Sequence, residues 1–437
     1  MKLTREALQA LDGKYHFLRE IAAEFDGKAR FTFSAKDNLC AKGMQATAGS
    51  KILEGYRPPF DATAIARLKA AGGDLIGKTN MDEFGFGTFS TNSGFGVPLN
   101  PYDVERACGG SSGGAAAAAC LLPGHVAVGV STGGSISCPA SFCGVFGMTP
   151  TYGRVSRYGL IDYGNSLDKI GVLSRSCAQA EEAFLLMAGR DERDPTSLAQ
   201  PPLPKEGRHV KNVAVPRETL QGLSPEVSTA FEEGLDQLRR GGIAVTEVSM
   251  PALQYAMPAY YVLATTEAST NLARYCGMRW GVREEDINQH FNDFFITPRS
   301  ENFGTEAKRR ILLGTYCRMV GFRDKYYMKA LAVRKMIISQ YEQVFSTHDL
   351  IATPTMPFVA PRFEEIRKMT PLQNYSADFL TIPPNLAGLP HISMPCAYAP
   401  MPVGLQLTAP HWDELTLLRL GKEWERSFKF AWPEVVA

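Results

Sequence analysis

The sequence predicts an α/β fold with a largely parallel or mixed sheet. Helix-like and strand-like runs alternate along the first half of the chain, and the second half shows the same kind of alternation. A hydrophobic content of 45% supplies enough apolar side chains for a large core. No internal repeat, coiled coil or low-complexity tract divides the 437 residues, so one large domain is favoured over two.

The elements of the first half are indicated by apolar periodicity and by glycine and proline at their ends. An Ala-rich run is expected to be helical until Pro123-Gly124 stops it, and the apolar run after it is typical of a central strand. Gly72-Gly73 ends an earlier helix in the same way. The expected elements are an amphipathic helix over residues 1–25, strands over 31–33, 74–77 and 125–130, and helices over 62–71 and 113–122.

The second half follows a Pro- and charge-rich stretch, residues 191–211, which is typical of a surface connection. Beyond it the hydrophobic pattern is again of the α/β kind. The expected elements are helices over 225–240 and 414–428, an almost continuous helix over 304–345, and strands over 243–248, 350–352 and 404–407.

Charge excludes several classes of function. Lys and Arg number 46 against 45 Asp and Glu, which leaves a net charge of +1. A chain so balanced lacks the basic surface of a protein whose main task is direct nucleic-acid binding. The same balance excludes a solvating acidic tail.

The nine cysteines are odd in number and widely spaced, and no two form a C-x-x-C pair. This pattern disfavours a disulfide framework and a zinc site, and it indicates buried thiols in a reducing compartment. The N-terminal segment lacks the apolar centre of a signal peptide, and the longest apolar run, residues 115–130, is interrupted by Pro123-Gly124. We therefore expect a cytoplasmic protein, with an organellar matrix as the alternative.

Two short motifs suggest functions that their context opposes. Residues 72–79 (GGDLIGKT) satisfy the phosphate-loop pattern, but the interior of the match reads as a strand and no helix follows it. The nucleophile-elbow pattern G-x-S-x-G occurs at Ser111, Ser112 and Ser131. A hydrolase triad of Ser131 with a later acid such as Asp378 and a late histidine, His391 or His411, stays open as a minority interpretation.

A larger constellation carries more information than any single glycine motif. It joins FSAKDN (33–38), GGSSGG (109–114) and STGGSISCP (131–139), so that two serine-bearing loops flank one helix–strand unit. Ser112 follows Lys36 by 76 residues and precedes Ser135 by 23. In this constellation the chain resembles the amidase signature family, from about residue 30 to its end.

The resemblance implies the amidase signature fold, a mixed central sheet covered by helices on both faces. It implies a single domain over residues 1–437, comprising an N-terminal helical segment (1–30), a signature core with the catalytic groups (31–180) and a remainder that completes the sheet and the substrate pocket (212–437). The family uses a Ser-cisSer-Lys triad. Matched motif by motif, Lys36 is the lysine, Ser112 the serine after a cis peptide bond, and Ser135 the nucleophile.

The chemistry of such a triad can be stated from the residue types. A serine needs a base, and a lysine acts as one only when burial lowers its pKa from about 10.4. Lys36 follows an apolar strand where its amine would lose water, and a hydroxyl between lysine and nucleophile relays the proton. The backbone amides of Thr132, Gly133 and Gly134 are expected to form the oxyanion hole. The triad needs no histidine, and His125, on an apolar strand, reads as a core residue.

Within the family, the chain is most similar to the glutaminase subunits of the glutamyl-tRNA(Gln)/aspartyl-tRNA(Asn) amidotransferases. This likeness implies a pocket for glutamine, with Arg310 on its α-carboxylate, Asp378 on its α-amino group and Tyr260 in the wall. The stretches that carry it are KTNMDEFGFG (78–87), GMTPTYGRVSRYGLI (147–161), SLDKIG (166–171), KRRILLGTY (308–316), TIPPNLAGLP (381–390) and PVGLQL (402–407).

The same likeness implies a heterotrimer with B and C subunits, in which the partner subunit binds the misacylated tRNA and uses ATP and Mg²⁺, while this chain holds no metal. One departure is local: the similar subunits usually have Asp and Arg where this chain has Ser131 and Ser137, and we expect hydroxyl hydrogen bonds to replace that brace. The alternatives are a stand-alone amidase for small aliphatic or aryl amides, and an inactive scaffold that binds a partner.

Overall fold

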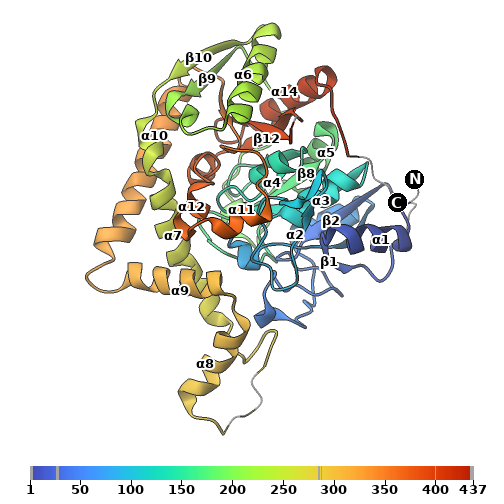
Figure 1. Cartoon of the computed structure of the whole chain (residues 1–437), viewed down its shortest axis with the longest axis vertical. Helices are drawn as coiled ribbons and strands as arrows, with labels where there is room; N and C mark the ends of the chain where they lie inside the picture. Colours follow the sequence, from blue (N-terminus) through green and yellow to red (C-terminus); the bar gives the residue numbers. More distant parts are fainter. Residues whose placement is uncertain (1–2, 26–28, 284–285, 287, 399, 434–437) are drawn as a thin grey trace.

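A mixed sheet runs through the centre of the molecule (Figure 1). The computed structural model describes residues 3–25, 29–283, 286, 288–398 and 400–433, and within these residues the sheet has eleven strands. In spatial order they are β1 (Leu18–Ile21), β3 (Gly73–Thr79), β2 (Phe31–Lys36), β6 (His125–Ser131), β8 (Lys169–Ser174), β7 (Phe146–Thr149), β12 (His391–Ala397), β13 (Val403–Thr408), β11 (Leu350–Pro354), β9 (Asn212–Pro216) and β10 (Ala244–Val248). A separate antiparallel pair joins β4 (Leu99–Asn100) and β5 (Asp103–Ala107).

Strand directions confirm the predicted mixed sheet. Strand β2 runs parallel to both β3 and β6, and β9 runs parallel to both β10 and β11. The strands between these two parallel groups pair antiparallel, from β6 through β8, β7, β12 and β13 to β11. Strands from both halves of the chain therefore belong to one sheet, with β7 and β12 in contact at its middle.

Helices cover both faces, as expected. Along β6, Val126, Val128 and Val130 point to one face and Ala127 to the other, because side chains alternate along a strand. Helices α2, α5, α6 and α14 pack on the first face, and α1 and α3 on the second, where α7 and α10 cover the β9–β11 end. The helices are α1 (Arg5–Tyr15), α2 (Thr63–Ala70), α3 (Gly113–Leu121), α4 (Ser137–Phe142), α5 (Cys177–Met187), α6 (Pro225–Arg240), α7 (Ala256–Asn271), α8 (Phe291–Asn302), α9 (Thr305–Arg318), α10 (Lys329–Phe345), α11 (Phe363–Lys368), α12 (Pro371–Ser376), α13 (Ile382–Leu386) and α14 (Glu414–Ser427).

Two expected helices differ from the observed ones. The N-terminal helix ends at Tyr15, because His16 adopts a left-handed conformation (φ 53°), and Leu18–Ile21 then pairs with β3 as an edge strand. Residues 1–2 of that expected helix lie outside the described residues. The almost continuous helix expected over 304–345 is observed as α9, a π-helical turn over Asp324–Met328 and α10, with a single break at residues 319–323 that contains Gly321 (φ +87°).

The structure also bears on the phosphate-loop motif, the cysteines and the apolar segments. Residues 73–79 form β3 rather than a phosphate loop opening a helix. All nine cysteines lie in the described part of the chain, each is a free thiol, and all but Cys276 are buried. Among the described residues, no helix combines the length and apolarity that crossing a bilayer requires.

Candidate active site

Lys36 ends β2 at the centre of the sheet, with β3 on one side and β6 on the other. Its side chain is buried, and Nζ donates to Ser111 Oγ at 2.7 Å and to the carbonyl oxygen of Val130 at 2.9 Å. Both partners lie in or beside the two serine-bearing loops. The lysine is thus held at the position where these loops meet the sheet.

The serine next to Lys36 is Ser111, so the expectation for Ser112 is wrong by one residue. The cis peptide bond joins Gly110 and Ser111, and it is the Ser111 hydroxyl that accepts the lysine hydrogen bond. Ser112 precedes the first residue of α3, and its Oγ donates instead to Val130 O at 3.2 Å. Two adjacent serines carry the same sequence signal, and only the path of the backbone decides which one faces the lysine.

Burial lowers the pKa of Lys36 to about 7, as its expected role as a base requires. The buried carboxyls of Asp82 and Asp168 act in the opposite direction, since negative charge favours the protonated amine. Burial also raises the pKa of Asp82 to about 6 and that of Asp168 to about 7. Three groups that titrate near neutrality therefore share one water-poor region, which is an arrangement suited to proton transfer.

Ser135 lies at the entrance to α4, in the second serine-bearing loop. It is buried, and its carbonyl oxygen accepts the backbone N–H of Ser112 at 3.2 Å, which ties the two loops together. The N–H groups of Gly133 and Gly134 donate no hydrogen bond to any group in the described part of the chain. These donors beside a serine hydroxyl have the composition of an oxyanion hole.

Both glycines of this loop are required by close packing. A Cβ atom at Gly134 would lie 2.0 Å from Oγ1 of Thr381, and one at Gly133 would lie 2.9 Å from the hydroxyl oxygen of Tyr260. The loop therefore approaches Tyr260 on α7 and the start of α13 more closely than any larger residue permits.

Thr132 is fixed on two sides by residues that the sequence alone did not single out. Its Oγ1 donates to Asp168 Oδ1 at 2.6 Å, and its carbonyl oxygen accepts from Nδ2 of Asn385. Asp168 also accepts the N–H groups of Tyr163 and Gly164, at 2.8 and 3.1 Å. Asp168 and Asn385 belong to the motifs SLDKIG and TIPPNLAGLP, but a motif does not show which of its members faces the loop.

Asp82 holds the first serine-bearing loop from the other side. Its carboxylate accepts the N–H groups of Ser90 and Asn92 at 3.0 and 2.8 Å. A Cβ at Gly110 would lie 2.2 Å from Asp82 Oδ2, so this glycine allows the loop to pass directly over the carboxylate. Asp82 belongs to the motif KTNMDEFGFG, which contributed to the family resemblance but indicated no role for this residue.

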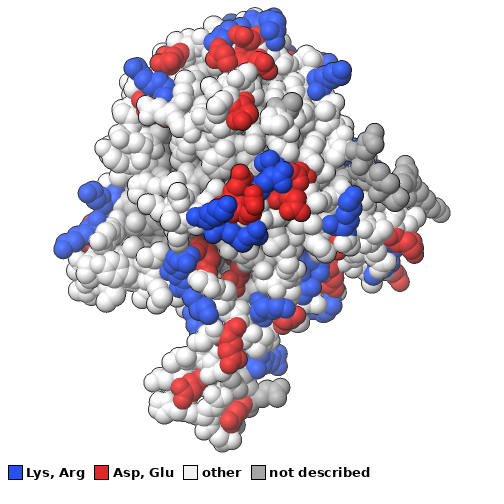
Figure 2. Space-filling model, viewed as in Figure 1, with Lys and Arg blue, Asp and Glu red and all other residues white. Residues whose placement is uncertain are grey.

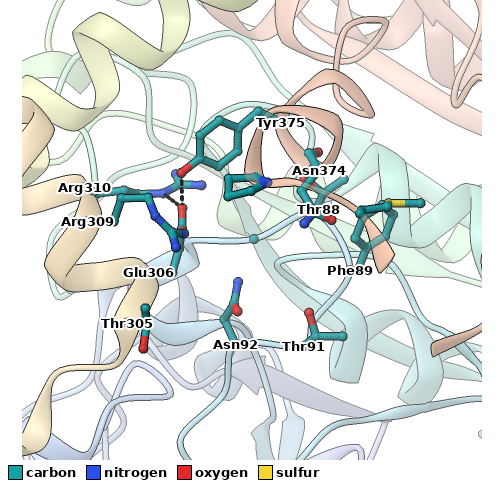
Figure 3. Close-up of a pocket in the computed structure, with 13 residues that line it drawn as sticks. Thr88, Phe89, Thr91, Asn92, Thr305, Glu306, Arg309, Arg310, Asn374 and Tyr375 are labelled. Atoms are coloured by element: carbon teal, nitrogen blue, oxygen red, sulfur yellow. Dashed lines mark hydrogen bonds and ion pairs between the residues drawn. The ribbon is translucent and has the colours of Figure 1, made fainter. Parts of the chain in front are cut away.

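A cavity of about 250 Å³ lies next to these loops (Figure 3). Three segments contribute to its wall: residues 87–92, the first turns of α9, and residues 369–375 around α12. The wall residue Thr88 accepts the N–H of Gly110 through its carbonyl oxygen at 2.6 Å. The cavity is therefore joined by one backbone hydrogen bond to the residue before Ser111.

Arg310 lines this cavity as a buried cation. Its Nε donates to Glu306 Oε1 at 2.8 Å and its Nη1 to the hydroxyl oxygen of Tyr163 at 2.5 Å. The aromatic rings whose centroids lie 5.1–5.6 Å from the guanidinium carbon are those of Phe86, Tyr163, Tyr261 and Tyr375. Glu306 is shared, because it also pairs with Arg309 and accepts from the hydroxyl of Tyr375 at 2.6 Å (Figure 3).

Asp378 and Tyr260 lie behind the cavity wall rather than among its lining residues. Thr88 donates from Oγ1 to Asp378 Oδ2 at 2.9 Å, and burial raises the pKa of the Asp378 carboxyl to about 7. The carbonyl oxygen of Asp378 accepts from the N–H of Thr381 at 3.1 Å, and Thr381 packs on Gly134. Asp378 is therefore linked through Thr88 to the cavity wall and through Thr381 to the serine loop, whereas Tyr260 packs directly on Gly133 of that loop.

The expectation for Ser131 and Ser137 is wrong. Both side chains are buried, and neither Oγ atom has a hydrogen-bond partner within the described part of the chain. Ser131 ends β6 and Ser137 begins α4, and their hydroxyls reach neither each other nor any other polar group among the described residues. No hydrogen bond takes over the bracing role.

His125, His391 and His411 form their hydrogen bonds away from the serine loops. His125 bonds to Thr32 Oγ1 at 3.0 Å and to Ser34 Oγ at 2.9 Å, which confirms it as a satisfied core residue, and burial lowers its pKa to about 3. His391 and His411 bond to the carbonyl oxygens of Leu389 and Ala387. With Ser131 unpartnered in the described residues, the alternative triad through a late histidine is not assembled.

Residues 31–418, a range that includes every side chain of this site, match the family model described as Amidase. The chain is similar to the A subunit of the glutamyl-tRNA(Gln) amidotransferase of Moorella thermoacetica, with 43% identity over 438 residues, covering 98% of this chain and 89% of that protein. The corresponding protein of Methanospirillum hungatei is 43% identical over 399 residues, covering 90% and 92%. The crystal structure of the A subunit of glutamyl-tRNA(Gln) amidotransferase from Thermotoga maritima aligns with a TM-score of 0.83 at 35% identity, covering 99% of this chain and 93% of that one.

Proposed function

The chain belongs to the amidase family, and on this premise we propose that it is the glutaminase subunit of a tRNA-dependent amidotransferase. In this function it releases ammonia from glutamine, and the ammonia converts Glu-tRNA(Gln) to Gln-tRNA(Gln), or Asp-tRNA(Asn) to Asn-tRNA(Asn). The names of the similar subunits support the first conversion. One observation carries the proposal. Thr88, in the wall of the cavity that buried Arg310 also lines, accepts a hydrogen bond from the loop whose Ser111 accepts one from Lys36.

The proposed reaction starts at Ser135. Its hydroxyl oxygen attacks the side-chain amide carbon of glutamine while its proton passes through Ser111 to neutral Lys36. The N–H groups at residues 132–134 stabilise the negative charge that develops on the amide oxygen. Lys36 returns the proton through Ser111 to the leaving nitrogen, and ammonia departs. Water then hydrolyses the γ-glutamyl ester and regenerates Ser135.

The charges around the cavity support a zwitterionic substrate over a small neutral amide. The guanidinium of Arg310 donates at Nε and Nη1 within the protein, which leaves its second terminal nitrogen for a carboxylate. Asp378 accepts from Thr88 at one oxygen, and the other, buried Oδ1, accepts no hydrogen bond of normal geometry among the described residues. We propose that these groups receive the α-carboxylate and the α-ammonium of glutamine, with Tyr260 behind them.

The proposal includes partners. We propose that a B subunit binds the misacylated tRNA and activates it with ATP and Mg²⁺, that a C subunit tethers the pair, and that this chain itself uses no metal. A net charge of +1 supports leaving RNA binding to the partner. Since the reaction needs charged tRNA, we propose that the complex works in the cytoplasm or in an organellar matrix.

The experiment that tests the proposal is ammonia release from glutamine by the purified chain, with and without co-expressed B and C subunits. We expect glutamine-dependent ammonia that rises with the partners and is lost in Ser135→Ala. Ser137→Ala, which changes a nearby serine outside the proposed triad, is the matched control and retains activity. If every preparation leaves glutamine intact while simple amides are cleaved through Ser135, the substrate assignment is wrong and the chain is a stand-alone amidase.

A further inference from the structure

Helix α9 is apolar on two opposite faces. Its inner face, with Ala307, Gly314 and Cys317 buried, packs on α7 so closely that a Cβ at Gly314 would lie 1.9 Å from the carbonyl oxygen of Thr265. The outer face carries Leu312, which is 71% exposed, with Leu313 directly after it and Tyr316 one turn further on. A helix on the surface of a monomer normally shows polar residues on its outer face, so three large exposed apolar side chains among the charged residues of α9 are unusual.

The apolar surface continues past the end of α9. Met319 and Val320 follow in the turn, and Val320 is 100% exposed. The ring of Tyr316 lies tilted against those of Phe322 and Tyr326, with centroids 4.4 and 5.9 Å away. We call this surface the α9 stripe; it comprises Leu312, Leu313, Tyr316, Met319, Val320 and Tyr326. Contiguous exposed apolar surface of this kind marks a site of protein interaction.

The border of the α9 stripe is basic. Between residues 305 and 329 the chain has Lys or Arg at seven positions and Asp or Glu at two, and one of the two acids, Glu306, is paired with both Arg309 and Arg310. Arg318, Lys325 and Lys329 are exposed beside the stripe, and none of them forms an ion pair within the described residues. Figure 2 shows this edge of the molecule, where α9 meets α10 in Figure 1, as largely uncharged surface with basic groups near it.

We propose that the α9 stripe is the docking surface for the companion protein that receives the ammonia, and that this partner presents an apolar ridge flanked by carboxylates. The proposal rests on the proposed function for the identity of the partner. Because the border of the stripe is basic, a partner with acidic residues around its contact surface would be attracted to it. The basic border also opposes pairing of two copies of this chain through the stripe, because two basic borders would then face each other. Nucleic acid is disfavoured because four of the six side chains of the stripe, Leu312, Leu313, Met319 and Val320, are neither charged nor aromatic, so that only Tyr316 and Tyr326 offer stacking surfaces.

Helix α9 contributes both to the wall of the cavity and to the stripe. Arg310 lines the cavity, and Leu312 begins the stripe two residues later on the same helix, a rise of about 3 Å along the axis. A partner seated on the stripe would therefore contact the helix that supplies Glu306, Arg309 and Arg310 to the cavity wall. The partner on the outer face of α9 and glutamine at its N-terminal half would thus both contact one rigid element.

The test measures binding of the full chain to purified companion B and C subunits from the same organism, by calorimetry. We expect L312E/V320E to raise the dissociation constant at least about tenfold, because two charges would enter an apolar contact. Leu185→Glu on α5, also an exposed leucine, is the matched control and binds within about twofold of the wild type. As a second variant, K325E/K329E changes two exposed positions and is expected to raise the dissociation constant at low salt and to reduce the dependence of binding on salt.

Three results would overturn the proposal. One is wild-type binding of the companion subunits by L312E/V320E. Another is a dimer of the chain alone that the same variant dissociates. The third is that the wild-type chain binds tRNA and that L312E/V320E loses this binding while it still binds the companion subunits. Ammonia release on the same samples separates the two proposals: binding without glutamine hydrolysis supports the docking surface and contradicts the proposed function, whereas glutamine hydrolysis without binding does the reverse.

Discussion

Nζ of Lys36 lies 2.7 Å from Oγ of Ser111, at the end of a central strand and out of contact with water. The same nitrogen also donates to the carbonyl oxygen of Val130, so its position relative to the serine is set by two hydrogen bonds rather than one. A buried amine with a lowered pKa can act as a base, and the hydroxyl beside it can pass a proton to it and back. The lysine and this serine should therefore act as one unit, and substitutions at either residue or at their neighbours should affect the same step.

The first prediction distinguishes two adjacent serines. Ser111→Ala removes the hydroxyl that accepts from Lys36, and we expect it to lower kcat by about 10²-fold or more. Ser112→Ala removes only a hydrogen bond to Val130 O, and its kcat should stay within about tenfold of the wild type. Steady-state ammonia release measures both. A larger loss in Ser112→Ala than in Ser111→Ala would contradict the assignment.

The second prediction concerns pH. Lys36 acts as a base only when neutral, so kcat/KM should rise as pH increases through about 7, the pKa to which burial lowers it. Asp168 raises the lysine pKa, and its removal in Asp168→Asn should therefore move the midpoint of this rise to lower pH. Asp236→Asn, an exposed change on α6, is the control and should leave the midpoint in place. An unshifted profile in Asp168→Asn would show that another group titrates.

The third prediction concerns the substrate carboxylate. Arg310→Lys keeps the charge but loses the planar fork, and we expect it to raise KM for glutamine by about 10- to 100-fold, the effect of losing a charge-assisted hydrogen bond of about 1.5–3 kcal/mol. The KM of a neutral amide, which has no carboxylate, should change far less. Arg239→Lys, an exposed change on α6 away from the cavity, is the matched control. Equal effects on both substrates would indicate that Arg310 supports the fold of the pocket instead.

The fourth prediction concerns the two unpartnered hydroxyls. A buried polar group without a partner costs about 1–3 kcal/mol, so S131A/S137A should raise the free energy of unfolding by about 1 kcal/mol. Ser141→Ala is the matched control: this buried hydroxyl accepts the N–H of Gly404 at 2.9 Å, and its loss should lower the free energy of unfolding. Denaturant unfolding measures all three proteins. Destabilisation by S131A/S137A would mean that these hydroxyls have partners after all.

Local signals predicted many of the elements that build the sheet and its helices. Helix α6 begins and ends at the predicted residues, because Pro225 fits the first helical turn and Gly241-Gly242 follows the last. Helix α14 and strands β11 and β13 lie within about two residues of their predicted bounds. The N-terminal prediction failed after Tyr15, since the apolar residues there pair with β3, and a pairing partner about 60 residues away leaves no local signal.

The sequence by itself determined the α/β class, the mixed sheet, the family and the short list of polar residues at its centre, because apolar period and motif composition are local properties of the chain. Only the tertiary structure decided which of Ser111 and Ser112 faces Lys36, that the charges of Asp82 and Asp168 act on the lysine, and that Ser131 and Ser137 have no partner among the described residues. These facts depend on the direction of single side chains and on contacts between segments far apart in the chain. Adjacent residues of one type share every sequence signal, and only packing gives them different neighbours.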